Sequence, residues 1–369
     1  MMLRVLAIFV LLAVVPPERA QAQLRGHGGP VRALAISPDG TQALSGSFDT
    51  SVIRWSLQRN AAEQVLRFHD GAVNAVAFLP DGRIATSGED ARIAIWRPGE
   101  PQPAMVLEGH KAPVVALAVS RDGATLASAS WDHTARLWPL AGGAPRLIEG
   151  HTQNVNGVAF TADGRALVTV GYDATLRLTP LVDDGGGGPI VTTLPAPLNT
   201  VAVALDGEIV TAGADGKVYV LSAKGEFNGE IEAAQTPIIA VALSPDGRLI
   251  AAAGIRGSVA IIDRASRKLE RTLVGPGLPV WSAAFFPDGR TLLTGGTDRM
   301  NIGAGGMSRR TAILATAPPG PSWSSPEIPS ARRGPRPSRS AVPASLSRGC
   351  RSWAPTRTAS TPSPASTRC

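Results

Sequence analysis

Cysteine is almost absent from this chain of 369 residues, and both copies, Cys350 and Cys369, lie near its C-terminal end. The rest of the chain therefore folds without disulfides. Histidine is also scarce, with five copies, and no His and Cys residues cluster at the spacing of zinc ligands. No C-x-x-C-H motif is present, so heme attachment is not available. These absences predict a protein without a metal or a cofactor.

Long apolar runs are also missing, apart from residues 5–15. This run is too short for a helix that crosses a bilayer core of about 30 Å, so we expect no membrane span. Arg4 precedes the run, and the small residues Ala20 and Ala22 follow it. The order is typical of a secretory signal peptide, with an uncleaved membrane anchor as the alternative. We expect residues 1–22 to be removed near Ala22, which predicts a periplasmic or secreted protein.

Acidic residues are nearly missing from one end of the chain. Residues 301–369 contain ten Arg, no Lys and one Glu, whereas residues 1–300 carry 26 basic against 28 acidic groups. The net charge of +7 therefore belongs to the tail. The body has no surplus of basic residues with which to bind a phosphate backbone, so we expect no nucleic-acid partner.

An Asp-Gly dipeptide recurs seven times between short apolar runs, with gaps of 40 to 43 residues. Asp-Gly favours tight hairpin turns because both residues tolerate a positive φ. In the third unit, residues 114–119 precede the turn and residues 125–130 follow it, which predicts two antiparallel strands. The seven dipeptides begin at Asp39, Asp81, Asp122, Asp163, Asp206, Asp246 and Asp288.

A second aspartate, or Arg256 in the sixth unit, ends the second strand of each unit. Tryptophans six residues after the first three of these aspartates close a third strand, such as residues 134–138. A fourth strand, such as residues 146–149, leads into the next unit. Four strands in about 41 residues predict a propeller blade, because each blade buries both faces against its neighbours in a ring. The aspartates are Asp49, Asp90, Asp132, Asp173, Asp215 and Asp298, and the tryptophans are Trp55, Trp96 and Trp138.

The third unit resembles a nearly complete WD repeat. Its markers are Gly109-His110, Asp122-Gly123, Trp131-Asp132 and Leu137-Trp138. The resemblance covers about residues 24–300 and is clearest in the first four units, because units five and six lack the His and the Trp. It implies an all-β, seven-bladed β-propeller of WD-repeat type over residues 23–300, with an incomplete last blade.

The resemblance also implies a hydrogen-bonded chain inside each blade, formed by a His, a Ser or Thr, the turn Asp and a Trp. Such groups satisfy one another when buried. A nucleophile held in such a chain is not presented to a substrate, so we expect no catalytic residue and no enzyme. The residues are His27, Ser45, Asp49 and Trp55; His69, Thr86, Asp90 and Trp96; His110, Ser128, Asp132 and Trp138; and His151, Thr169 and Asp173, with Thr179 in place of the fourth Trp.

The residues just before the aspartates that end the second strands should project on one rim of the ring. Phe48, Trp131 and Tyr172 would place aromatic groups there, as binding hot spots often do, with Glu89 on the second blade. Packing against a neighbouring blade's loop is an equally good explanation for the aromatic residues. We interpret Phe48, Glu89, Trp131 and Tyr172 as partner-binding residues. The other rim positions hold Ala214, Ile255 and Thr297.

The seventh unit breaks off after Asp298, because Ala304 occupies its tryptophan position. Residues 301–369 contain eleven prolines and almost no acidic residue, which predicts a disordered tail. The tail is either an authentic basic segment that holds the protein to anionic surfaces or the product of a reading-frame shift. We favour the shift, because a natural linker would begin after the blade.

Ring closure is therefore expected to be weak. Residues 23–25 could close the last blade, but we expect unpaired edges there and do not expect residues 311–315 to act as a makeshift strand. Elsewhere, Asp183 and Asp184 precede four glycines without a following Lys-Ser/Thr, which indicates a flexible insertion between blades.

Together these features predict a periplasmic scaffold, monomeric and without catalytic activity, that binds a protein or peptide. This step follows from family analogy, because a fold does not fix a function. The chain also resembles bacterial exported WD-repeat proteins fused to a c-type cytochrome domain, a domain that is absent here. The alternative is therefore the remnant of a propeller and cytochrome c electron-transfer protein.

Overall fold

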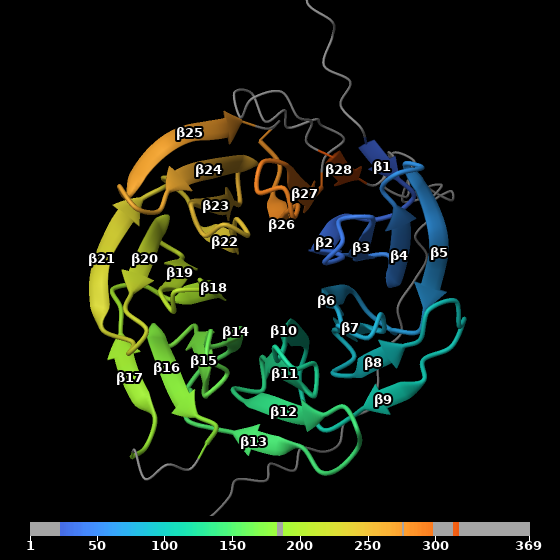
Figure 1. The fold of residues 1–369 in the computed structure, drawn as a ribbon, viewed down its shortest axis with the longest axis horizontal. Helices are drawn as coiled ribbons and strands as arrows, with labels where there is room; N and C mark the ends of the chain where they lie inside the picture. Colours follow the sequence, from blue (N-terminus) through green and yellow to red (C-terminus); the bar gives the residue numbers. More distant parts are fainter. Residues whose placement is uncertain (1–22, 183–186, 275–276, 298–312, 317–369) are drawn as a thin grey trace, which may run out of the picture. The chain divides into compact units, whose positions relative to one another are not determined.

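The computed structural model describes residues 23–182, 187–274, 277–297 and 313–316. All regular elements in these residues are β-strands, which confirms the predicted all-β class. Six blades each contain four consecutive antiparallel strands, and a further four-stranded sheet joins the first and last described strands. Figure 1 shows the sheets set around a central axis, with the first strand of each blade innermost.

The six blades follow one another in chain order. Blade one holds β2 (Val31–Ile36), β3 (Gln42–Ser47), β4 (Ser51–Ser56) and β5 (Ala61–Arg67), and blade two holds β6 (Val73–Phe78), β7 (Ile84–Gly88), β8 (Ile93–Trp96) and β9 (Met105–Leu107). Blade three holds β10 (Val114–Val119), β11 (Thr125–Ser130), β12 (Ala135–Pro139) and β13 (Arg146–Ile148), and blade four holds β14 (Val155–Phe160), β15 (Ala166–Gly171), β16 (Thr175–Pro180) and β17 (Ile190–Thr193).

The last two blades and the closing sheet complete the architecture. Blade five holds β18 (Leu198–Val203), β19 (Ile209–Gly213), β20 (Lys217–Leu221) and β21 (Phe227–Glu232), and blade six holds β22 (Ile238–Leu243), β23 (Leu249–Gly254), β24 (Ser258–Asp263) and β25 (Lys268–Val274). The closing sheet consists of β26 (Val280–Phe285), β27 (Leu292–Gly296), β28 (Ile313–Thr316) and β1 (Gln23–Arg25).

Burial follows the position of each strand in its blade. The second strands are buried on both faces, as in β7, because neighbouring blades cover both sides. The outermost strands are largely exposed, as in β5, where Leu66 is the buried residue. Small residues allow close approach between blades: a Cβ on Gly46 would lie 2.7 Å from Val73 Cγ1 of blade two. The hydrophobic core therefore lies between the blades.

The innermost strands form a closed circle. Contacts run from β2 through β6, β10, β14, β18 and β22 to β26, and β26 contacts β2 again. One hydrophobic cluster spans this junction, since Leu293 of the closing sheet and Leu24 of β1 pack with Val31 and Trp55 of blade one. The predicted weak point is therefore covered by apolar packing.

The Asp-Gly hairpins differ in conformation from our prediction. Only the glycines have a positive φ, between 62° and 91°, and none of the seven aspartates does. In the first hairpin, the Asp39 carboxylate instead accepts hydrogen bonds from the Ser37 hydroxyl and the Thr41 amide. The loop thus needs one left-handed residue, and aspartate is favoured as an acceptor for its own turn.

The expected unpaired edge of the seventh unit is a second correction. Strand β28 pairs with β27 on one side and with β1 on the other, both in parallel orientation. The sequence prediction failed because β28 arrives from a segment of low apolar periodicity, beyond the point where the repeat pattern ends. Parallel pairing also needs a longer connection than a hairpin, which separates β28 from β27 in sequence.

Candidate functional site

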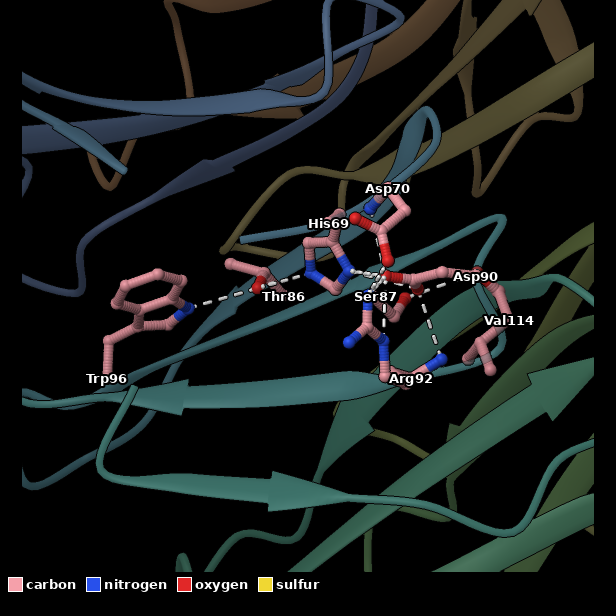
Figure 2. A network of polar contacts seen from close by, with 8 residues as sticks. All are labelled: His69, Asp70, Thr86, Ser87, Asp90, Arg92, Trp96 and Val114. Atoms are coloured by element: carbon pink, nitrogen blue, oxygen red, sulfur yellow. Dashed lines mark hydrogen bonds and ion pairs between the residues drawn. The ribbon is translucent and has the colours of Figure 1, made fainter. Parts of the chain in front are cut away.

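Buried polar chains hold the first three blades together internally. In blade two, His69 Nδ1 lies 3.0 Å from an Asp90 oxygen and Nε2 lies 2.9 Å from Thr86 Oγ1, while Trp96 donates its indole N–H to the same oxygen over 3.0 Å (Figure 2). Because the carboxylate only accepts, His69 Nδ1 carries the proton and Nε2 accepts from the threonine hydroxyl. Every polar side-chain atom of this four-residue network thereby has a hydrogen-bond partner.

Blades one and three repeat this arrangement. The histidine Nε2 atoms lie 2.7 Å from the hydroxyls of Ser45 and Ser128. The structure also brings His27 to Asp49 and Trp55 to Ser45, and His110 to Asp132 and Trp138 to Ser128. In blade four, His151 contacts Thr169 and Asp173, and Thr179 occupies the tryptophan position without joining the chain.

The polar chains shift the pKa values of their aspartates. Burial alone would raise the pKa of Asp90, but the hydrogen bond from His69 and the backbone amides of Arg92 and Asp70 lower it to about 2. The same opposition lowers the pKa values of Asp49 and Asp132. Burial lowers the pKa of His151, which keeps its ring neutral against the pull of Asp173. These carboxylates are structural anions.

Blades five and six replace the chain in two different ways. In blade five, Leu194 stands at the histidine position, the Tyr219 hydroxyl donates to Asp215 over 2.5 Å, and the Thr211 hydroxyl donates to a backbone carbonyl. In blade six, Ala234, Ala252 and Arg256 take the places of His, Ser or Thr, and Asp. Blade six thus lacks all three of these members of the polar network together, so none of them is left without the others.

The hydroxyl groups of these chains are closed to substrates. Ser45, Thr86 and Ser128 have no exposed surface. Among the residues that the structure describes, no group of three or more His, Cys, Asp or Glu side chains could hold a metal ion. The same residues include no helix with the length and hydropathy of a membrane span.

The predicted rim residues share one backbone hydrogen bond. The amide N–H of each donates to the carbonyl of the residue just before the innermost strand, as from Trp131 to Pro113 over 3.0 Å. The same bond recurs at Phe48, Glu89, Tyr172, Ala214, Ile255 and Thr297. Phe48, Trp131 and Tyr172 are 38%, 37% and 47% exposed, and Glu89 is also exposed. The rim residues therefore project at equivalent places.

The aromatic rim residues also pack against neighbouring sheets, as the alternative explanation requires. The rings of Phe48 and Trp281 lie 6.1 Å apart, and Trp131 donates its indole N–H to Asn156 over 3.1 Å. Because more than a third of each side chain stays exposed, packing and presentation to a partner are compatible.

A β-bulge in each innermost strand adds a second ring of residues that sequence reasoning missed. The register shifts at the second residue of the strand, so this residue has no cross-strand partner. These residues line a cavity of about 390 Å³ on the central axis, together with Trp131 and Tyr172. We call them the bulge ring: Arg32, Asn74, Val115, Asn156, Asn199, Ile239 and Trp281.

Arg32 joins the bulge ring to the rim. Its guanidinium carbon lies 5.3 Å from the ring centre of Phe48, 5.6 Å from that of Trp281 and 6.0 Å from that of Trp131. Burial lowers the pKa of Arg32, while the Glu89 carboxylate raises it. A partly desolvated cation thus stands among three aromatic rings at the mouth of the cavity.

Several sequence predictions lie outside the described residues. They concern the signal peptide at residues 1–22, the Asp183-Asp184 segment, Ala304, and the tail except β28. Export to the periplasm and the cytochrome relationship stay predictions.

Comparison with known proteins supports the repeat assignment. A family model for the WD domain, G-beta repeat, matches residues 19–56, 61–97, 101–139, 144–179 and 267–300. Each match begins at the outermost strand of one sheet and continues into the next, so that β1 and β2–β4 belong to the first repeat. A search of curated proteins finds no match. The blade architecture and these five matches show that the chain belongs to the WD40-repeat family of β-propellers.

Proposed function

We propose that the chain is a non-enzymatic periplasmic scaffold whose rim binds a protein or peptide partner through Phe48, Glu89, Trp131 and Tyr172. The observation that carries this proposal is the gathering of exposed aromatic side chains around one cavity mouth, beside a desolvated arginine. Aromatic and arginine side chains supply most binding energy at protein interfaces, and they do so when a rigid frame holds them.

The frame supports this role because the polar chains hold the turns that carry the rim residues. Each rim residue follows a buried second strand and precedes an aspartate whose carboxylate is fixed by a histidine in blades one to four. A partner would therefore meet side chains that lose little conformational freedom on binding. Protein partners are also the common ligands of WD40 propellers, and this step is an analogy with the family.

We further propose that the closing sheet acts as the seventh blade of a monomeric ring. The circle of contacts through β26, its pairing with β27, and the position of β1 as the outermost strand support this proposal. The secretory character of residues 1–22 motivates the periplasmic location.

Affinity capture from periplasmic extract tests the proposed function. The wild-type chain should retain a specific partner, and Trp131→Ala should lose it, because a central aromatic anchor contributes about 2 kcal/mol or more to binding. Ile255→Ala is the matched control, since Ile255 is equally exposed at the equivalent rim position of blade six and is not aromatic. Equal retention by wild type and Trp131→Ala would contradict the proposal.

A further inference from the structure

Three neighbouring positions of the bulge ring carry polar groups that the described residues leave unpaired. They belong to Trp281 of the closing sheet, Arg32 of blade one and Asn74 of blade two, whose innermost strands contact one another in this order. The indole nitrogen of Trp281 and both amide atoms of Asn74 are buried and without a hydrogen bond in the described residues. Each such group costs about 1–3 kcal/mol, so the cluster needs an explanation.

Asn74 is the exception among three equivalent asparagines. Asn156 and Asn199 each donate to the carbonyl of the first residue in the next innermost strand, Leu198 and Ile238, over 2.9 and 2.8 Å. The corresponding carbonyl for Asn74 belongs to Val114, which instead accepts from Ser87 over 3.2 Å (Figure 2). The Asn74 amide is only 6% exposed and lines the cavity with its donor and acceptor free.

Arg32 contributes the charge of the cluster. Its guanidinium forms no hydrogen bond or ion pair with the described residues, although it can donate five hydrogen bonds. The Glu89 carboxylate is near enough to act on Arg32 through its charge, but lies beyond the 4 Å of an ion pair. The aromatic faces of Phe48, Trp131 and Trp281 already hold this cation, so a second cation is disfavoured there.

The unpaired groups are mainly donors, which favours an acceptor-rich anion. A carboxylate has about four acceptor positions and matches the planar fork of a guanidinium. With one cation and the opposing charge of Glu89, the mouth suits a single negative charge better than a phosphate dianion. The cavity of about 390 Å³ is large enough for one side chain or chain end, and Ala33, Leu34 and Val76 line its wall.

We propose that Arg32, Asn74 and Trp281 bind a carboxylate of the partner peptide, as an acidic side chain or a C-terminus. This inference rests on the proposed function, because it names the partner chemistry of the same rim. The aromatic rim residues would contact the peptide beside the carboxylate, and the carboxylate would enter the mouth of the cavity.

Calorimetric titration of three short peptides tests the proposal. The probes are acetyl-Ala-Glu-Ala-amide, its Gln counterpart, and acetyl-Ala-Gln-Ala with a free C-terminus. Binding of the Glu peptide or of the free C-terminus, but not of the blocked Gln peptide, is expected, and it identifies the source of the carboxylate. Equal binding of all three peptides, binding of none, or tighter binding of inorganic phosphate would overturn the proposal.

Variants assign the site to its residues. Arg32→Met should weaken carboxylate binding by about tenfold or more, because the substitution removes the charged donor while it keeps a long side chain. Arg121→Met is the matched control, an exposed arginine at the opposite end of a blade, and should bind as the wild type does. Glu89→Gln should tighten binding, and added salt should weaken it.

Asn74→Leu separates a binding role from a structural one. Removal of a buried unpaired amide should raise the denaturation midpoint, while carboxylate affinity falls. A raised midpoint with unchanged affinity would exclude Asn74 from the site. If Arg32→Met keeps the partner in affinity capture but Trp131→Ala loses it, the carboxylate site fails and the scaffold function stands. If the peptides bind but no partner is captured, the carboxylate site stands and the scaffold function fails.

Discussion

Blades one to three and the closing sheet solve the same packing problem with opposite results. In blade two, the Thr86 hydroxyl at the centre of the second strand serves both His69 and Trp96. Thr294 holds the equivalent place in β27, and its hydroxyl is buried without a partner in the described residues. A threonine at this position thus links two hydrogen-bond partners in blade two, whereas in the closing sheet its unpaired hydroxyl destabilises the fold. A repeat position contributes stability only when its whole set of partners is present.

Blades five and six show intermediate solutions. Blade five keeps the threonine but turns its hydroxyl to a backbone carbonyl, and blade six carries Ala252 instead. The turns after the second strands follow the same division. Thr50, Ala91, His133 and Ala174 have a positive φ in blades one to four, while Gly216 and Gly257 occupy this place in blades five and six. The polar chains therefore accompany turns that a side chain strains.

Removal of β28 should break the comparison most strongly. A chain that ends at Met300 exposes the edges of β27 and β1, which lose six paired positions in the closing sheet. We expect a loss of about 2–4 kcal/mol in the free energy of unfolding, from about 1 kcal/mol for each lost hydrogen bond, and association through the free edges. Denaturant unfolding and light scattering measure both effects.

A chain that ends at Trp323 is the matched control. It keeps β28 and the whole compact unit of residues 1–323. Its unfolding midpoint should equal that of the full chain. Equal midpoints for both truncated chains would contradict a stabilising role of β28 in the closing sheet.

A matched pair of Thr→Val substitutions sharpens the comparison. Thr86→Val should lower the free energy of unfolding by about 1–3 kcal/mol, because it leaves His69 and Trp96 without their common partner. Thr294→Val should leave it unchanged or raise it by up to about 1 kcal/mol, because an unpaired hydroxyl is removed. Urea unfolding of both variants gives the two values, and similar losses would refute the distinction.

Acid should remove the contribution that Asp90 makes to the free energy of unfolding in blade two, a contribution that blade six lacks. The pKa of Asp90 is about 2 in the folded chain against an ordinary 3.8, so its contribution is complete above pH 4 and is lost as the pH falls toward 2. With solvent screening, this amounts to about 1–2 kcal/mol. Blade six has Arg256 at this position, so the equivalent contribution is missing there, although its Asp246 and Asp263 also have lowered pKa values.

Urea midpoints between pH 5 and pH 2 measure the acid effect. The wild type should lose more stability over this interval than Asp90→Asn, which keeps an oxygen for the His69 hydrogen bond. Parallel loss in both proteins would place the acid sensitivity elsewhere.

The repeat pattern predicted the strands well because turn residues mark their ends. The predicted strands at residues 114–119 and 125–130 agree with β10 and β11. The polar chains could be inferred only through the family resemblance, since spacing alone does not show that His110 and Ser128 meet. The bulge ring escaped prediction because one inserted residue leaves a strand's apolar run intact. A polar residue second in the innermost strand, as at Arg32 and Asn74, was the available signal.

The bulges have a consequence for how such a molecule diversifies. Each one frees a single side chain from cross-strand pairing and places it beside the axial cavity, where Asn156 and Asn199 also donate to the next innermost strand. Substitutions at the five other positions can therefore alter what the axial opening accepts without removing these hydrogen bonds between innermost strands. In this chain the seven positions hold one arginine, three asparagines, one tryptophan, one valine and one isoleucine.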